Sequence, residues 1–204
     1  MPKTKIAVVE TGAGNLGSLA RFIHALGYPM ETVKRDPGPR QTKSHICLIP
    51  GVGSFGAAMQ RVEKNGLRDF IHRSYARGQL IIGICLGAQI LLDRSEESPG
   101  WKGLGLIPGE NRHLSKNPVY KGKCPRIGWQ TVIPTPSGKQ TPGSFYFMHS
   151  FEMIPADKKA IWGKSNDGVN ALVGTDNVWG IQPHPEKSQS SGFALLQQII
   201  KKTC

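Results

Sequence analysis

The sequence predicts an α/β fold: a mostly parallel central sheet flanked by helices, with a smaller antiparallel β portion in the second half of the chain. Three observations lead to this fold class. Up to residue 92, short apolar runs rich in β-branched residues alternate with helical patterns, which is the order of a parallel sheet. The segment 80–92 joins a strand to a helix through a turn with a glycine on either side of a cysteine. After Asp93, prolines and glycines divide the chain into short strand patterns.

The length and composition indicate a single domain over residues 1–204. A chain of 204 residues is long enough to bury a substantial core, and a second full domain would be cramped. The hydrophobic share of 38%, with 25 glycines and 15 prolines, is typical of a compact protein rich in tight turns. Because no apolar stretch at the start is long enough for a signal peptide or a membrane span, we expect a cytoplasmic protein without a membrane partner.

The charge pattern favours a solvated or docking surface over a nucleic-acid site. The formal net charge of +12 is compatible with an acidic protein partner, a phosphorylated substrate nearby or nucleic acid. Basic residues fall in loop-like stretches, such as 34–43 and 116–123, without the interleaved aromatic side chains that stack on bases. We therefore expect no nucleic-acid partner.

The cysteines indicate thiols rather than a disulfide framework or a metal centre. No C-x-x-C pair and no zinc-like spacing with histidine is found among Cys47, Cys85, Cys124 and Cys204. We expect neither a metal nor another cofactor.

The chain is predicted to begin with a strand, a glycine-rich turn and a helix. Residues 5–10 form a buried strand, the turn 12–17 follows, and a helix over 18–26 ends at Gly27 as its C-cap. The turn also fits the G-x-G-x-x-G pattern of dinucleotide sites. No acidic residue ends a second Val/Ile-rich strand at the expected distance, so nucleotide binding stays the weaker alternative.

Two further strands and a second glycine turn come next. Residues 29–34 and 45–49 are predicted strands, and the turn 50–56 contains glycines that let the backbone approach a ligand and point amides inward. An ordinary strand-to-helix turn is the alternative interpretation. Helical patterns follow over 54–77, broken near Gly66.

The strand–turn–helix over 80–92 supplies a candidate nucleophile. The spacing Gly83-x-Cys85-x-Gly87 is the cysteine counterpart of the Gly-x-Ser-x-Gly nucleophile elbow, which needs neighbours with almost no side chain. The amide of Leu86 then becomes a candidate oxyanion donor. Free cysteine is also among the most buried residue types, so a core thiol is the alternative.

The second half reads as strands followed by a closing helix. Strand patterns recur at 145–149, 160–162, 170–173 and 178–181, and a helix is expected over 188–202. Its amphipathic pattern is carried by Phe193, Leu195, Leu196, Ile199 and Ile200.

A base and its orienting group are predicted where the last strand ends. Pro183 and Pro185 disfavour helical backbone at the residues before them, so the segment is expected to be extended. Residues two apart in an extended chain face the same side, which presents His184 together with Glu186. An imidazole oriented by a carboxylate is what a thiol nucleophile requires.

The other histidines are predicted to be weaker candidates or structural residues. His149 ends a strand and is a weaker candidate, which we interpret as a pocket wall or packing group. We expect purely structural roles for His24, His45, His72 and His113.

Taken together, these motifs carry a family resemblance. The chain resembles the class I, triad-type glutamine amidotransferases, and among them the glutaminase subunits of imidazole glycerol phosphate synthases, over nearly its whole length. The residues that carry the resemblance are 50–53, 83–89, 103–109, 127–130, 146–150 and 184–186.

The resemblance implies an enzyme that hydrolyses L-glutamine to glutamate and ammonia through a cysteine thioester. It implies Cys85, His184 and Glu186 as the triad and Val52, Gly53 and Leu86 as the oxyanion hole. It places glutamine against Gly51, Gln89, His149, Ser150 and Phe151. It further implies a heterodimer with a cyclase-type (β/α)₈ synthase subunit that uses the ammonia in histidine biosynthesis, with Trp129, Tyr146 and Lys187 facing that partner.

Four departures from the family pattern leave alternatives open. Ala88, Gln130, Pro183 and the start Glu10-Thr11-Gly12 differ from the usual residues, and none removes a catalytic group. A paralogue that supplies ammonia to another amidation, such as that of a sugar for surface polysaccharide, is therefore an alternative, since fold and motif fix the chemistry better than the acceptor. Alternatives of other classes are a stand-alone cysteine hydrolase and a non-catalytic binding module.

Overall fold

The fold is seen in a computed structural model that describes residues 4–12, 16–38, 44–138 and 140–203. Three sequence-based expectations fall partly outside these ranges. Residues 13–15 of the first glycine-rich turn, residues 39–43 of the basic stretch and Cys204 lie outside the described residues.

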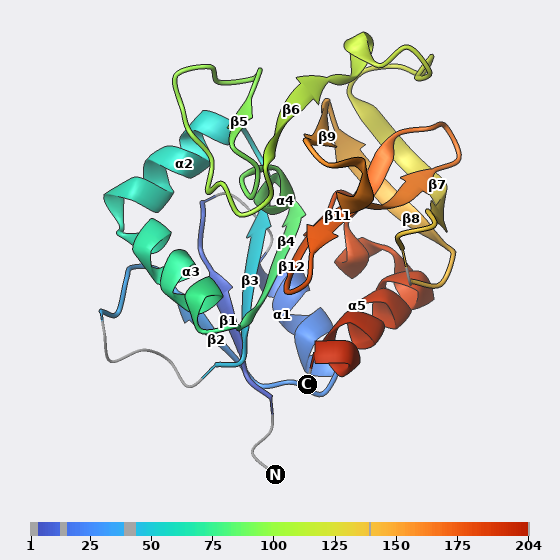
Figure 1. Ribbon diagram of the computed structural model, residues 1–204. Helices are drawn as coiled ribbons and strands as arrows, with labels where there is room; N and C mark the ends of the chain where they lie inside the picture. The colour runs from blue at the N-terminus through green and yellow to red at the C-terminus, as the bar shows by residue number, and fades with distance from the viewer. Residues whose placement is uncertain (1–3, 13–15, 39–43, 139, 204) are drawn as a thin grey trace.

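One half of the main sheet is parallel, as predicted. Its strands lie in the order β2-β1-β3-β4-β12, and each adjacent pair within this group of five is parallel. Figure 1 shows β1, β3, β4 and β12 side by side at the centre of the molecule. The bounds are β1 Ile6–Val9, β2 Met30–Val33, β3 Ile46–Gly51, β4 Leu80–Cys85 and β12 Val178–Ile181.

The antiparallel portion continues the same sheet. Beyond β12 the order is β11-β10-β7-β8, with antiparallel pairing throughout, so the described residues form one nine-stranded mixed sheet. A second, three-stranded sheet has the order β5-β6-β9. The bounds are β5 Arg94–Ser95, β6 Gly109–His113, β7 Arg126–Pro134, β8 Gly143–His149, β9 Phe151–Pro155, β10 Ile161–Ser165 and β11 Asn170–Thr175.

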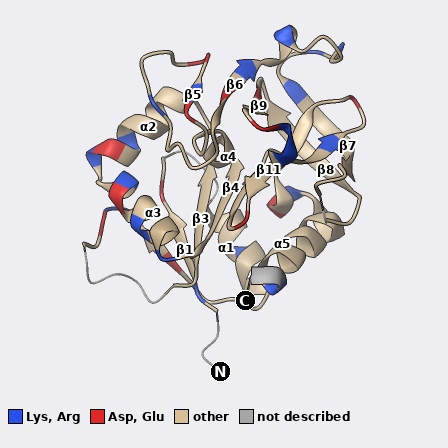
Figure 2. Ribbon diagram, in the orientation of Figure 1, with Lys and Arg blue, Asp and Glu red and all other residues tan. Residues whose placement is uncertain are grey.

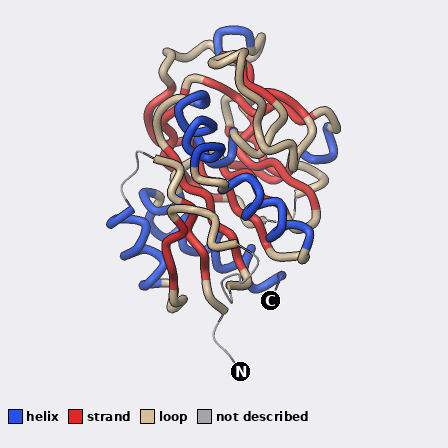
Figure 3. The backbone as a smooth tube through the Cα atoms, turned by 90° about the vertical axis from the view of Figure 1, so that its left-hand side faces the viewer, coloured by secondary structure: helices blue, strands red, loops and turns tan. Residues whose placement is uncertain are grey.

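Helices cover both faces of the parallel half. In Figure 1, α2 and α3 lie on one side of the strands and α1 and α5 on the other, and Figure 3 views the molecule from the side of α2 and α3. None of the described helices is long and apolar enough to cross a membrane. The bounds are α1 Leu16–Ala25, α2 Phe55–Lys64, α3 Leu67–Ala76, α4 Leu86–Gln89 and α5 Gln189–Thr203, with 3₁₀ turns η1 Leu114–Lys116, η2 Lys158–Ala160 and η3 Pro185–Lys187.

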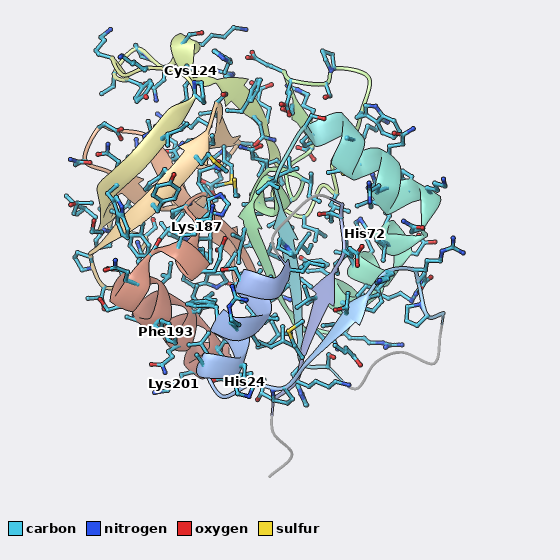
Figure 4. All side chains as sticks on the ribbon, turned by 180° about the vertical axis from the view of Figure 1, so that it is seen from behind. His24, His72, Cys124, Lys187, Phe193 and Lys201 are labelled. Atoms are coloured by element: carbon cyan, nitrogen blue, oxygen red, sulfur yellow. The ribbon has the colours of Figure 1, made fainter. Side chains whose placement is uncertain are left out.

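Two apolar cores form because side chains alternate along the central strands. In β1, Ala7 and Val9 pack towards α2 and α3, whereas Ile6 and Val8 pack towards α1 and α5. A parallel sheet buried on both faces requires such continuous apolar strands. The second core also joins α1 to α5 through the rings of Phe22 and Phe193, whose centroids are 4.7 Å apart; Figure 4 labels Phe193 on α5.

Charged residues are distributed over many elements of the molecule. Figure 2 shows Lys and Arg on several elements of both halves of the molecule. Among the described residues several basic side chains form ion pairs, as between Arg68 and Glu63 (2.7 Å) and between Lys116 and Glu96 (2.8 Å).

Two elements differ from the sequence prediction. The helix after Cys85 is a single turn, because the carbonyls of Ile90 and Leu91 accept hydrogen bonds from the amides of Leu104 (2.7 Å) and Leu106 (2.9 Å) instead of continuing the helix. Strand β9 is not predicted from the sequence: after His149 the chain leaves the main sheet at Ser150 and pairs with β6 in the second sheet. The break near Gly66, with φ of 66°, and the cap at Gly27 are confirmed.

The glycines around Cys85 are required by close backbone packing. A Cβ atom at Gly87 would lie 1.7 Å from the carbonyl oxygen of Ile49, and one at Gly83 would lie 2.5 Å from the carbonyl oxygen of Gly87. Both contacts involve backbone, which cannot move aside by changing a rotamer. The end of β3 and the start of α4 can therefore touch only at glycine.

We expect Gly87→Ala to destabilise the fold strongly. Overpacking against backbone should lower the free energy of unfolding by about 3 kcal/mol or prevent folding. Thermal denaturation followed by circular dichroism measures the change. Gly100→Ala is the control, since a Cβ there meets nothing within 4 Å. Equal thermal unfolding midpoints for Gly87→Ala and Gly100→Ala would contradict the close packing of Gly87 against Ile49.

Candidate active site

Cys85 lies on a strained turn between β4 and α4. Its φ of 54° and ψ of −111° are unusual for a residue with a side chain. Such a conformation costs about 1–3 kcal/mol and persists only where the surroundings fix it. Here Gly83 and Gly87 pack against neighbouring backbone and hold the turn. The structure thus has the geometry of a nucleophile elbow at the position that the sequence predicts.

The neighbouring strand brings His184 to Cys85. In the parallel pair of β4 and β12, Ile84 lies opposite Ile181, so the residues that follow both strands emerge at the same sheet edge. His184 comes three residues after Ile181, and its amide donates to the carbonyl oxygen of Tyr146 in β8 (2.8 Å). Residues distant in sequence therefore meet because β12 inserts beside β4.

The imidazole of His184 is oriented by Glu186. Its Nδ1 lies 2.8 Å from Oε1 of Glu186, and both side chains are largely buried. The prediction of a fully extended segment is wrong in detail, because Glu186 belongs to the 3₁₀ turn η3. A proline is well suited to the first position of a helical turn, and Pro185 holds that position. This turn, rather than strand-like alternation, brings the carboxylate beside the ring.

The environment of His184 favours its protonated form. Burial lowers the pKa of the ring, but Cys85 and Glu186 together outweigh this effect and raise the pKa to about 10. Nε2 of His184 is buried and has no hydrogen-bond partner among the described residues. With Nδ1 bound to Glu186, Nε2 is the nitrogen available to exchange a proton with a group beside the thiol.

The sulfur of Cys85 faces a polar wall. The side chain is 5% exposed, and its Sγ lies 3.7 Å from the carbonyl oxygen of Met148 and 3.9 Å from Nε2 of Gln182. Nε2 of Gln89 in turn donates to Oε1 of Gln182 (3.2 Å) and to the carbonyl oxygen of Phe151 (3.0 Å). Gln182 is not predicted as a site residue, although a polar residue that ends a buried strand just before His184 is a usable signal in the sequence.

A cavity of about 310 Å³ opens onto Cys85. It is large enough for a small amino acid and has a carboxylate, amides and a thiol on its wall. The residues expected in the oxyanion hole and, except for Gly51, those expected around glutamine come together here. The lining comprises Val52, Gly53, Cys85, Leu86, Gln89, Glu97, Pro125, Ile127, Met148, His149, Ser150 and Phe151.

Gly51 does not line this cavity. It lines a smaller cavity of about 30 Å³ together with His184 and Glu186. A Cβ at Gly51 would be 3.1 Å from the amide nitrogen of Gly87, so this glycine allows the turn to approach the elbow.

His149 is a neutral part of the cavity wall. Burial is the main cause that lowers its pKa to about 4, and the charge of Arg126 acts in the same direction. Nδ1 lies 2.9 Å from the carbonyl oxygen of Phe151, so it is the donor, and Nε2 accepts from Nη1 of Arg126 (3.1 Å). Arg126 also pairs with Asp167 (2.8 Å) and lies 4.0 Å from the centre of the Phe147 ring. Both ring nitrogens are thus occupied, as expected for a wall residue.

The three residues expected to face a partner lie next to one another at the surface, where Trp129 and Lys187 are exposed and Tyr146 is half-buried. The rings of Trp129 and Tyr146 are 6.0 Å apart, and Nζ of Lys187 lies 5.6 Å from the centre of the Tyr146 ring. Figure 4 labels Lys187 near β8. Ile127 and Ile133 alternate with Trp129 along β7 and are 60% and 53% exposed. We call this surface, made of Ile127, Trp129, Ile133, Tyr146 and Lys187, the β7–β8 face.

Comparison with known sequences finds one protein family over nearly the whole chain. Residues 7–202 match the family model described as glutamine amidotransferase class-I. Among curated proteins, the chain is 37% identical over 201 residues to imidazole glycerol phosphate synthase subunit HisH of Moorella thermoacetica, covering 95% of this chain and 93% of that protein. It is 36% identical over 206 residues to the protein of the same name from Bacillus subtilis, covering 96% and 95%.

Solved structures share the fold. PurLQS from Thermotoga maritima contains a chain that matches with a TM-score of 0.76 and 21% identity, covering 99% of this chain and 100% of that one. A structure described as glutamine amidotransferase matches with a TM-score of 0.76 and 15% identity, covering 97% and 98%. The mixed sheet and flanking helices are therefore those of this fold family.

We expect the pKa of His184 to fall in Cys85→Ala and in Glu186→Gln. Each change removes a partner that raises the pKa, while burial continues to lower it. NMR titration of the ring measures the midpoint, which is expected at about 10 in the unaltered protein. Since this pKa lies above the ordinary 6.5, the imidazolium stabilises the fold most below pH 6.5, and that contribution is lost as the pH rises towards 10.

His149 provides the internal control for this titration. Its ring is neutral above about pH 4 and should not titrate across the neutral and alkaline range. The same titration midpoint for His184 in the unaltered protein, in Cys85→Ala and in Glu186→Gln would contradict the assigned effect of these two partners on its pKa.

Proposed function

This chain belongs to the class-I glutamine amidotransferase family, and we propose that Cys85, His184 and Glu186 carry out its hydrolysis of L-glutamine. The single observation that carries the assignment of these residues is the meeting of a strained thiol with an oriented imidazole at one sheet edge, beside a cavity of about 310 Å³. Family membership supports a glutaminase and leaves the individual residues open, and the geometry of the site indicates the role of each.

In the first half-reaction, glutamine binds with its side-chain amide carbon next to Sγ of Cys85. The sulfur attacks this carbon, and the carbonyl electrons move onto oxygen. His184 holds the proton taken from the thiol and gives it to the amide nitrogen, so the carbon–nitrogen bond breaks and ammonia leaves. The raised pKa of His184 supports this role, because the ring retains the proton until the nitrogen accepts it.

The oxyanion is stabilised by backbone amides at the cavity wall. Leu86 is the first residue of α4, where amides lack partners within the helix, and it follows the nucleophile directly. Val52 and Gly53 line the same cavity. Their amides are the second source of donors, and the positive φ of Gly53, 107°, makes this turn dependent on glycine.

In the second half-reaction, water attacks the glutamyl thioester. His184 accepts a proton from the water and returns it to the sulfur as the carbon–sulfur bond breaks, which releases glutamate and restores Cys85. Glu186 keeps Nδ1 of the ring engaged throughout, so Nε2 carries each proton.

The ammonia is delivered to a cyclase-type (β/α)₈ partner that makes imidazole glycerol phosphate in histidine biosynthesis. Support comes from the name and near-complete coverage of the relatives from Moorella and Bacillus. The β7–β8 face supports docking next to the site, since Ile127 belongs both to that face and to the cavity wall. A docked protein would therefore cover the mouth of the cavity.

Cys85→Ser should abolish glutamine-dependent turnover while the complex still uses ammonium salt. The hydroxyl is a far weaker nucleophile than the thiol, whereas the partner's chemistry needs only ammonia. Product formation with glutamine and with ammonium chloride, measured on the purified complex, separates the two activities. Loss of both would argue against this division of labour.

A glutamine-analogue electrophile tests the nucleophile directly. We expect labelling at Cys85 in a one-to-one ratio and loss of labelling in His184→Ala, detected by mass spectrometry. An inert Cys85 would favour a non-catalytic binding module, and rapid turnover by the isolated chain would favour a stand-alone hydrolase.

Trp129→Ala should weaken binding of the barrel partner by about tenfold or more, because an exposed aromatic side chain at an interface centre often dominates affinity. The dissociation constant is measured by calorimetry with the partner that co-purifies from native cells. Tyr75→Ala is the control, since Tyr75 is a comparably exposed aromatic residue on α3, away from the β7–β8 face. Equal dissociation constants for Trp129→Ala and Tyr75→Ala would show that the β7–β8 face does not bind the partner. Recovery of a different barrel would identify a paralogue.

A further inference from the structure

The segment between His184 and α5 is built around one buried hydroxyl. Ser188 is 1% exposed and immediately precedes α5. A serine in this position commonly accepts a hydrogen bond from an amide in the first helical turn. The Ser188 hydroxyl instead donates to the carbonyl oxygen of His184 (2.5 Å) and accepts from the amide of Tyr146 (3.0 Å).

These bonds make a closed bridge between β8 and His184. The amide of His184 donates to the carbonyl oxygen of Tyr146 (2.8 Å), so both backbone groups of Tyr146 are used to hold the His184–Ser188 turn. His184 is in turn held through both its amide and its carbonyl. Its backbone is thus fixed to strand β8 on one side and to the turn on the other.

The surrounding backbone is strained and closely packed. Gln189, directly after Ser188, has φ of 48°, and Cys85 is the other described residue with a side chain and a positive φ. A Cβ at Gly192 would lie 1.9 Å from the carbonyl oxygen of Pro185, so α5 is packed directly against the turn that carries Glu186. A strained residue beside an unusual use of the serine hydroxyl indicates that the position of the turn is fixed tightly.

The geometry points to Ser188 as a positioning residue for the imidazole of His184. This inference depends on the proposed function, in which His184 transfers the proton. Ser188 does not face the cavity at Cys85 and acts through the backbone of His184. Because Tyr146 belongs to the β7–β8 face, the same hydroxyl also connects that face to the backbone carbonyl of His184 through two hydrogen bonds.

Ser188→Ala is the test variant, studied as the full chain with the barrel partner that co-purifies. We expect kcat for glutamine hydrolysis to fall about 10- to 100-fold with KM within about twofold, because a small displacement of a proton-transfer group costs rate rather than binding. Ser190→Ala is the control, an exposed serine on the same helix. Ser188→Thr keeps the hydroxyl and should retain most of kcat.

The pKa of His184, measured by NMR in the isolated full chain, provides a readout that a purely structural role would not move. It should fall in Ser188→Ala as the ring loses its placement between Cys85 and Glu186. A lower melting temperature with unchanged kcat and unchanged His184 pKa would overturn the proposal. If the unaltered protein does not hydrolyse glutamine, the proposed function fails, and the NMR comparison still decides whether Ser188 positions the ring.

Discussion

The contact between the end of β3 and the start of α4 is the constraint on which the site depends. The carbonyl of Ile49 approaches Gly87 so closely that no side chain fits, and this packing holds Cys85 in a backbone conformation that costs about 1–3 kcal/mol. The same contact places the turn at Gly53 and the first amide of α4 around one cavity. The proposed nucleophile and the proposed oxyanion donors are thus brought together by a single close approach of two backbone segments.

The second requirement is the position of β12 in the sheet. By pairing in parallel with β4 and antiparallel with β11, this strand joins the two halves of the nine-stranded sheet. The residues that follow it therefore reach the edge where Cys85 lies, and β8 from the antiparallel half binds them from the other side. The proposed catalytic groups of this glutamine amidotransferase lie at the boundary between the parallel and antiparallel parts of one sheet.

Buried polar side chains keep the cavity wall in one arrangement. Gln89 and Gln182 bond to each other beside the thiol, and Arg126 fixes the neutral ring of His149. An unpaired polar group in such a place would cost about 1–3 kcal/mol, so each of these side chains is held by its partners. Beside the His184–Glu186 pair, the cavity wall carries the carboxylate of Glu97, which accepts a hydrogen bond from the amide of Phe55 (2.6 Å).

The local parts of this protein follow from its amino-acid sequence: the order of strands and helices up to residue 92, the elbow at Cys85 and the pairing of His184 with Glu186. Glycine spacing, proline positions and apolar periodicity are local properties, so they can be read without a fold. Tertiary structure alone decided that the antiparallel strands extend the main sheet, that the helix after Cys85 stops after one turn and that β9 joins a second sheet. It also decided the contacts of Gln182, Arg126 and Ser188, because these buried polar side chains bond to partners that are distant in sequence.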